Sequence, residues 1–223
     1  MRCSPKVGLR DASLVAVGFY GVRRISEILA LQIEDLTFNT GDVNILVKRQ
    51  KNDPYGRGHS CTIPKIPELG VLCPYRLLKE WTKEWPRKWG GLKEAPPVFY
   101  NIQDEESPPG GISADYIRKL LQDSFQREGV GTHSLRKGGC CWMRFDLGLD
   151  EETIQAQGGW ASRECMQQAY TVLSRDQQRL RLLAGVAAKF STTVENADRT
   201  TAIPNVTPKK RGRPPKPKTK PVA

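Results

Sequence analysis

Six side chains spread along this sequence have the types needed to cut a phosphodiester bond without a metal ion. They are two arginines, a lysine, a histidine, a tryptophan and a tyrosine: Arg24, Lys51, His133, Arg136, Trp160 and Tyr170. A phosphodiester under attack develops negative charge on its non-bridging oxygens, which fixed cations and hydrogen-bond donors must meet when no metal is present. Arginine suits this role because its planar fork grips phosphate in a bidentate manner and stays charged. We therefore expect Arg24 and Arg136 to clamp one phosphate.

The remaining residue types fit the same target. His133 precedes Arg136 by three positions, so on a helix the two side chains share a face. Lys51 follows a strand-like run in a turn, from which a flexible ammonium can reach a leaving oxygen. Tyr170 would be the nucleophile, because a phenol with a pKa of about 10 loses its proton at neutral pH only with help from nearby cations.

Each of these residues also has an ordinary explanation when it is taken alone. The arginines and the lysine are compatible with solvated surface positions, and the histidine with a helix cap or a core position. Trp160 follows two glycines and either donates its indole N–H to a phosphate oxygen or only packs beneath the site. The prediction therefore depends on the combination and its order.

The order of these motifs resembles the catalytic domain of the tyrosine recombinases, the phage integrase family. The resemblance covers roughly Leu9 to Ala187, and these segments carry it: Arg24-Ile25-Ser26-Glu27, Leu31-Gln32-Ile33-Glu34-Asp35-Leu36, Lys51-Asn52-Asp53-Pro54, His133-Ser134-Leu135-Arg136, Gly158-Gly159-Trp160 and Tyr170. Arg23 lies beside Arg24, and the Ile-Ser-Glu that follows favours Arg24 as the family's first arginine.

The resemblance implies a mechanism. In this family the tyrosine attacks DNA to leave a 3'-phosphotyrosyl link and a free 5'-hydroxyl, and a second hydroxyl reverses the step, so no cofactor is needed. Carried onto matching positions, the two arginines bind the scissile phosphate, Glu27 supports the first of them, and the histidine shuttles or orients protons. Lys51 protonates the leaving oxygen, Trp160 takes the slot where many relatives have histidine, and Tyr170 attacks.

The hydrophobic pattern predicts a mainly α-helical fold with a small three-stranded antiparallel β-sheet, an α+β domain. Leu14 to Leu36 is apolar at helical spacing and is broken at Gly18 and Gly21, which predicts two helices around a tight corner. Short runs separated by turn formers predict the strands: Leu36 to Phe38, Val43 to Val47 and His59 to Ile63.

The second half of the pattern predicts further helices. Leu72 to Trp85 should be ended by Pro86. Ile112 to Arg127 should be capped by Ser113 and should carry these apolar residues on one face: Ile117, Leu120, Leu121 and Phe125. The others are His133 to Leu147, Glu151 to Gln157, Ser162 to Tyr170 and Val172 to Phe190. The last of these either covers its own core or docks onto a neighbouring subunit.

The expected organisation is an N-terminal remnant over residues 1–8, a catalytic domain over 9–190 and a tail without folded structure over 191–223. Tyrosine recombinases normally close an N-terminal helical domain around DNA, and about a dozen residues precede the catalytic part here. With fewer phosphate contacts, the chain alone is expected to bind DNA weakly at physiological salt. The interval from Trp160 to Tyr170 is also one residue longer than the family's usual spacing.

Charge points to a polyanionic partner. The net charge is +11, and the tail from Ser191 holds eight basic and two acidic residues, and so six of these eleven charges. No run approaches the roughly 18 apolar residues of a membrane span, so we expect no membrane partner. The six cysteines form no C-x-x-C pair, and His59 with Cys61 has no second ligand pair at a usable spacing, so we expect neither disulfides nor a metal.

The tail itself contains a motif that resembles an AT-hook, which lies along the minor groove of A·T-rich DNA. Arginines enter the narrow groove, where the negative potential is greatest, and glycine permits close approach. The residues are Lys209, Lys210, Arg211, Gly212, Arg213 and Pro214. A plain basic tail or a nuclear import signal explains the same composition, and the interpretations can coexist.

Three functions fit the sequence. The first is an active DNA strand-exchange enzyme that integrates or recombines DNA, working as a tetramer on DNA as the family does. The second is a catalytically silent DNA-binding protein derived from a mobile-element recombinase, and the third is a type IB topoisomerase. The Gly-Gly-Trp motif and Arg136-Lys137-Gly138-Gly139 resemble recombinases of eukaryotic mobile elements, which implies a nuclear location; otherwise an intracellular one is expected.

Overall fold

The computed structural model describes residues 5–48, 58–83, 85–89, 92, 96–102, 110–170 and 182–184, with the backbone alone for residues 86 and 168–170. The chain divides into two units, Met1–Leu173 and Ser174–Ala223, and every element below lies in the first. Lys51 and the AT-hook-like motif at 209–214 lie outside the described residues. Among the described helices, none combines the length and apolar character needed to cross a bilayer.

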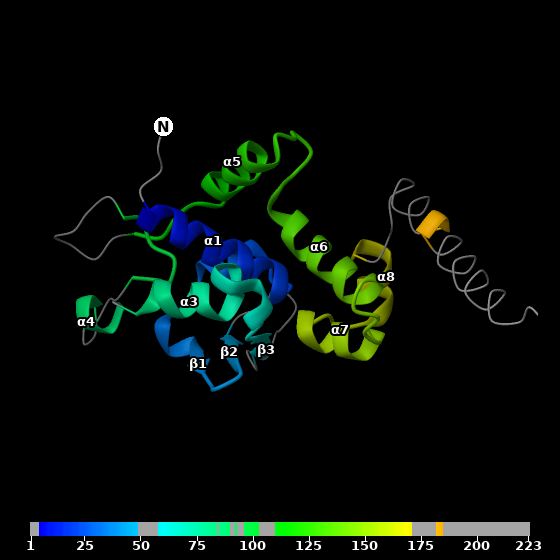
Figure 1. Cartoon of the computed structure of the whole chain (residues 1–223), viewed down its shortest axis with the longest axis horizontal. Helices are drawn as coiled ribbons and strands as arrows, with labels where there is room; N and C mark the ends of the chain where they lie inside the picture. Colours follow the sequence, from blue (N-terminus) through cyan, green and yellow to red (C-terminus); the bar gives the residue numbers. More distant parts are fainter. Residues whose placement is uncertain are drawn as a thin grey trace, which may run out of the picture. The chain divides into compact units, whose positions relative to one another are not determined.

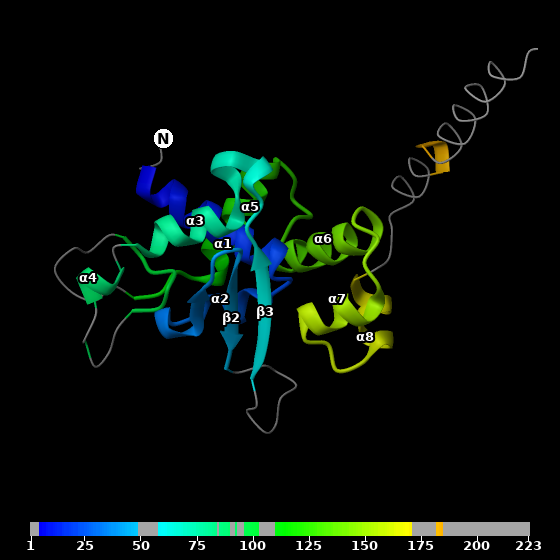
Figure 2. The same cartoon turned by 60° about the horizontal axis from the view of Figure 1, so that its bottom comes forward.

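The first unit is mainly helical and contains one small sheet, as Figures 1 and 2 show, which confirms the predicted fold class. Its α-helices are α1 (Pro5–Tyr20), α2 (Ile25–Leu29), α3 (Pro74–Thr82), α4 (Trp85–Trp89), α5 (Ala114–Phe125), α6 (Thr132–Phe145), α7 (Glu151–Gly158) and α8 (Arg163–Tyr170). Its 3-10 turns are η1 (Ile33–Asp35) and η2 (Pro67–Leu72), and its strands are β1 (Leu36–Phe38), β2 (Asp42–Val47) and β3 (His59–Pro64).

The sheet has the order β1-β2-β3, and both strand pairs are antiparallel. Val43 pairs with Ile63 and both are completely buried, whereas the next pair, Asn44 and Thr62, is exposed. This alternation follows from the two-residue period of a strand in a sheet with one buried face. Since β2 is central, β3 is an edge strand, and Figure 2 shows it on the side of the sheet that faces α7.

Helix α1 packs against both α3 and α6. Two glycines bring α1 and α6 close together: a Cβ atom on Gly18 would lie 2.8 Å from Cδ1 of Leu135, and one on Gly139 would overlap the backbone oxygen of Phe19. The helices therefore touch almost backbone to backbone. This contact fixes α6, and with it Arg136, against the end of α1.

Helices α6, α7 and α8 share a second apolar cluster, to which the corner between α1 and α2 contributes one residue. Its members are Val22, Cys140, Met143, Ile154, Trp160 and Met166, and all are buried. Burial of apolar side chains contributes roughly 25 cal/mol per Å² of surface removed from water. The cluster therefore holds the three C-terminal helices of this unit against the corner.

Two local predictions are wrong and one is confirmed. Pro86 does not end a helix: α3 stops at Thr82, and Pro86 is the second residue of α4, where a first-turn position needs no amide hydrogen. The break predicted at Gly18 is also wrong, because α1 continues through Gly18 to Tyr20. Ser113 caps α5 as predicted, its Oγ accepting a hydrogen bond from the amide of Tyr116 at 3.1 Å.

Candidate functional site

The corner between α1 and α2 is a strained turn that carries two adjacent arginines. Val22 has a φ of 53°, in the left-handed region that β-branched residues rarely adopt. Such strain costs on the order of 1–3 kcal/mol and persists only where the surroundings over-determine the conformation. The Val22 side chain is completely buried in the second apolar cluster, which it forms with residues of α6, α7 and α8 and with Trp160. This packing supplies the restraint. The turn places Arg23 and Arg24 at the start of α2.

Arg24 is held by Glu27. The Arg24 Nη1 donates to Oε1 of Glu27 at 2.7 Å, and the Arg24 backbone amide donates to Oε2 of the same carboxylate at 3.1 Å. Glu27 is buried, whereas the Arg24 side chain keeps 20% of its surface exposed. The carboxylate therefore fixes the stem and one edge of the guanidinium of Arg24, and part of the side chain still reaches solvent.

Arg23 is the more deeply buried of the two arginines, with 1% of its surface exposed. Its Nε donates to the carbonyl oxygen of Gly21 at 2.8 Å and its Nη2 donates to the carbonyl oxygen of Gln157. Its Nη1 lies 3.9 Å from Oε2 of Glu27, so that one carboxylate faces both arginines. Sequence reasoning noticed Arg23 only as a rival of Arg24, and a pair of adjacent arginines gives no signal that one of them is buried.

Arg136 comes to the same corner from α6 and is completely buried. Its Nη1 donates to the carbonyl oxygen of Val22 at 2.5 Å and its Nη2 to that of Gly158 at 3.0 Å. The guanidinium carbon lies 4.0 Å from the centroid of the Trp160 ring, which is a cation–π contact. Arg136 is thus not a surface arginine in this structure.

The end of α7 is shaped by two glycines so that Trp160 can fold back beneath Arg136. Gly159 has a φ of 65° and ends the helix in the left-handed conformation. A Cβ atom on Gly158 would overlap the six-membered ring of Trp160. Trp160 itself is 7% exposed, so of the two roles considered for it the structure displays packing.

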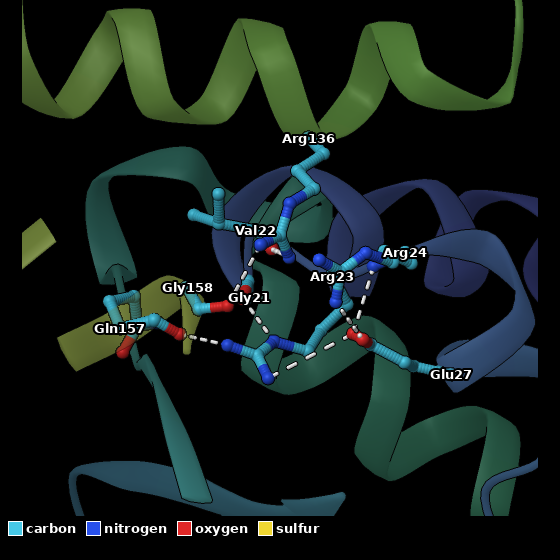
Figure 3. Close-up of polar contacts among 8 residues, drawn as sticks. All are labelled: Gly21, Val22, Arg23, Arg24, Glu27, Arg136, Gln157 and Gly158. Atoms are coloured by element: carbon cyan, nitrogen blue, oxygen red, sulfur yellow. Dashed lines mark hydrogen bonds and ion pairs between the residues drawn. The ribbon is translucent and has the colours of Figure 1, made fainter. Parts of the chain in front are cut away.

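Figure 3 shows that the corner has an excess of positive charge. Arg23, Arg24 and Arg136 approach it from two segments of the chain, and Glu27 is the one acid among the eight residues drawn. A buried charge is costly unless it is paired or hydrogen-bonded, and here backbone carbonyl oxygens take much of that role. Guanidinium groups bind anions with several oxygens, and in this structure those of Arg23 and Arg136 are instead buried against carbonyl oxygens.

Gln157 is a second residue that sequence reasoning missed. Its Nε2 donates to the carbonyl oxygens of Thr62 at 2.7 Å and Tyr20 at 3.1 Å, and its Oε1 accepts from the amide of Thr62 at 3.2 Å. Its backbone oxygen also accepts from Arg23. One residue therefore ties the end of α7 to β3, to the last residue of α1 and to a buried arginine. A single glutamine before two glycines carries no signal for this.

The other candidate residues lie as follows. His133 is the second residue of α6, one turn before Arg136, and is exposed. Tyr170 is the last residue of α8, which packs against α6 and α7. Residues 49–57, including Lys51, lie outside the described part, between the paired ends of β2 and β3. The structure thus brings Arg24, Glu27, Arg136 and Trp160 to one corner.

Burial and positive charge also affect a histidine at the start of β3. Desolvation lowers the pKa of His59 below its ordinary value, and the positive charge of Arg23 lowers it further. Because the ordinary value is about 6.5, the imidazole is mainly neutral at pH 7. His59 lines an open groove of about 700 Å³ between β3 and α7, together with Ser60, Thr153 and Gln157.

The chain belongs to the phage integrase family, because the sequence model of that family matches residues 2–177. An integrase/recombinase XerD homologue of Selenomonas ruminantium is 42% identical over 74 residues, which are 33% of this chain and 21% of that protein. The type 1 fimbriae regulatory protein FimE of Escherichia coli K12 is 27% identical over 158 residues, which are 69% of this chain and 70% of FimE.

Solved structures show the same fold. The XerH site-specific recombinase bound to a palindromic difH substrate aligns with a TM-score of 0.60 and 24% identity over 84% of this chain and 48% of XerH. XerA recombinase aligns with a TM-score of 0.56 and 18% identity over 83% of this chain and 65% of XerA. The chain thus spans about a fifth of the XerD homologue and about half of XerH.

Proposed function

We propose that this chain cleaves and rejoins DNA strands at specific sites through a 3'-phosphotyrosyl intermediate, as an enzyme of integration or recombination. The observation that carries the proposal is the convergence of Arg24, Arg136 and Trp160 on one corner with excess positive charge. XerH and XerA, whose fold this chain shares, are recombinases, and XerH was solved bound to a palindromic difH substrate in a post-cleavage complex. Membership of the phage integrase family supports the same chemistry.

The proposed reaction uses each candidate residue once. Arg24 and Arg136 hold two oxygens of the scissile phosphate, and Glu27 keeps Arg24 in place. The phenol oxygen of Tyr170 attacks phosphorus, the bond from phosphorus to the 5' oxygen breaks, and Lys51 gives that oxygen a proton. His133 carries away the proton that the Tyr170 phenol loses, and Trp160 supports Arg136 from below. The reverse reaction with another 5'-hydroxyl rejoins the strand, so bond energy is conserved.

A second function is favoured by a different observation. Arg136 is completely buried and is bonded to two carbonyl oxygens, so a phosphate reaches it only if the corner opens. A protein that binds DNA through this fold without cutting it needs no such opening. The alternative is therefore a catalytically silent DNA-binding protein.

A suicide-substrate trap separates these functions. The full chain is incubated with duplexes of random sequence that carry a nick close to the cleaved bond, so that the released 5'-hydroxyl fragment diffuses away and the adduct persists. A covalent adduct on a denaturing gel that is lost in Tyr170→Phe supports the enzyme. Binding without an adduct supports the silent protein, and relaxation of a plasmid without a specific site would instead indicate a topoisomerase.

We also propose finer properties that rest on the sequence. The tail motif Lys209 to Pro214 acts as an AT-hook that tethers the catalytic part to A·T-rich duplex and raises its local concentration. The chain acts as a tetramer on DNA, originates from a eukaryotic mobile element and works in the nucleus. The proline-interrupted basic composition of the tail supports the first of these, and the family's mode of assembly supports the second.

A further inference from the structure

The carboxylate of Glu27 is shared by two arginines. Its Oε1 accepts a hydrogen bond from Nη1 of Arg24 at 2.7 Å, and its Oε2 accepts one from the backbone amide of Arg24 at 3.1 Å. Nη1 of Arg23 faces the same Oε2 at 3.9 Å, as Figure 3 shows. This separation makes an ion pair but is too long for a hydrogen bond. One negative charge therefore lies between two positive ones.

Arg23 keeps one donor atom for this carboxylate. Its side chain is buried, and its Nε and Nη2 donate to the carbonyl oxygens of Gly21 and Gln157. Its Nη1 is buried as well, and within the described part of the chain this atom has no hydrogen-bond partner. A buried donor on a charged group is costly when it lacks an acceptor. Nη1 would therefore gain by closing on the Glu27 carboxylate that it faces.

We propose that Arg23 is a positioning residue for Arg24 and acts through Glu27, an inference that rests on the proposed function. As Arg24 takes hold of the scissile phosphate, the Glu27 carboxylate turns toward Nη1 of Arg23 while it keeps its bond to the Arg24 guanidinium. The negative charge of Glu27 is then balanced mainly by a buried cation that does not touch the phosphate. The positive charge of Arg24 stays available for a phosphate oxygen.

Removing the charge of Arg23 should therefore weaken Arg24. The Glu27 carboxylate would be balanced by Arg24 alone, so that Arg24 would offer less positive potential to the phosphate. Charges a few ångströms apart interact more strongly in or near a protein than in water, which makes this loss appreciable. The loss should depend on whether the reacting phosphate is itself charged, whereas a loss of packing should not.

A change in the charge of the substrate tests this dependence. A DNA duplex recovered from the trapping experiment is synthesised with either the ordinary phosphodiester or a methylphosphonate at the cleaved bond. In the methylphosphonate a methyl group replaces one non-bridging oxygen, so the group is neutral while the same bond to the 5' oxygen breaks. The two diastereomers are separated, because each lacks a different oxygen. Adduct formation is measured as a single-turnover rate on the phosphodiester and on each diastereomer.

Arg23→Gln keeps a side-chain donor and removes the charge, so it should lower the rate on the phosphodiester about 10- to 100-fold. On one methylphosphonate diastereomer its rate should lie within about threefold of the wild-type rate on that duplex. The same diastereomer should rescue Arg24→Ala, because both variants weaken the contact with one oxygen. Arg23→Lys keeps the charge, so its ratio of phosphodiester to methylphosphonate rates should stay within about threefold of the wild-type ratio.

Equal losses on all duplexes in Arg23→Gln would show a general structural role and overturn the inference. Rescue by the diastereomer that does not rescue Arg24→Ala would overturn it too, as would a wild-type rate on the phosphodiester. If Arg23→Gln does not fold, Arg23→Lys decides, and a changed ratio of its rates would overturn the inference.

Arg10→Gln is the matched control. Arg10 is also buried and lies 2.7 Å from a carboxylate, that of Asp11, but it bonds to Tyr116 and not to the corner. Any loss in this variant should be equal on all duplexes. A ratio of two rates measured on one preparation does not depend on the folded fraction. If the wild-type chain forms no adduct on any duplex, the proposed function itself fails and the inference falls with it.

Discussion

The guanidinium of Arg136 lies 4.0 Å above the ring centroid of Trp160, and both side chains are buried. This contact joins α6 to the segment after α7 at the point where the α1–α2 corner meets both. A desolvated cation–π contact of this kind stabilises by about 2 kcal/mol. The position of Arg136 thus depends on Trp160, and the position of Trp160 depends on the residue that lets its ring fold back, Gly158.

Gly158→Ala is expected to destabilise the fold and to displace Trp160 from Arg136. The added Cβ atom would overlap the indole ring, and overpacking of this kind costs about 1–3 kcal/mol. Urea unfolding, monitored by tryptophan fluorescence, measures the loss in the free energy of unfolding. Gly8→Ala is the matched control, because no atom lies within 4 Å of its added Cβ and alanine favours a helix. An equally stable Gly158→Ala variant would contradict the described packing.

Gly139→Ala and Gly138→Ala form a second matched pair, on consecutive residues of α6. At Gly139 the new Cβ atom would overlap the backbone oxygen of Phe19, which cannot move without shifting α1. At Gly138 the nearest atom is the ring carbon Cε2 of Phe19 at 3.3 Å, which can give way. We expect a loss of more than about 2 kcal/mol for the first and a change within about 1 kcal/mol for the second. Chemical denaturation of both variants measures their free energies of unfolding. Similar losses in the two variants would contradict the close approach of α1 and α6.

The sequence predicted the sheet and the helices because alternation and helical spacing are local patterns. The three strands and the corner at Gly21 were found in this way, whereas α1 runs through the second break, predicted at Gly18. The buried state of Arg23 and the three-way bonding of Gln157 could not be predicted, since they depend on contacts between residues 95 to 137 positions apart. Phe125 shows a related limit: the pattern puts it on one face with Ile117 and Leu121, which are buried, yet it is 62% exposed, because helical phase gives a face and not burial.

Stability should decrease when His59 is protonated. Burial and Arg23 lower the pKa of His59 in the folded chain, so at mildly acidic pH the unfolded chain binds the proton more readily. The stability present above the unfolded pKa of about 6.5 is therefore lost as the pH falls from there through the lowered folded pKa. The urea midpoint of wild type and of His59→Gln is measured from pH 7.5 to 5. The dependence of the urea midpoint on pH should be weaker in His59→Gln than in wild type, and an equal dependence in both would disprove the prediction.

The tail supplies a last prediction, on DNA binding. If Arg211 and Arg213 enter the minor groove, replacing both with alanine should weaken binding to A·T-rich duplex about tenfold or more and binding to G·C-rich duplex far less. Replacing Lys218 and Lys220 removes the same charge and should weaken both equally. Deleting Lys209 to Ala223 should combine the two effects. Fluorescence anisotropy at one fixed salt concentration gives the dissociation constants. Equal losses of affinity for both duplexes in the arginine variant would show that the tail binds DNA only through nonspecific charge. An A·T preference requires that these two side chains read groove width rather than phosphate alone.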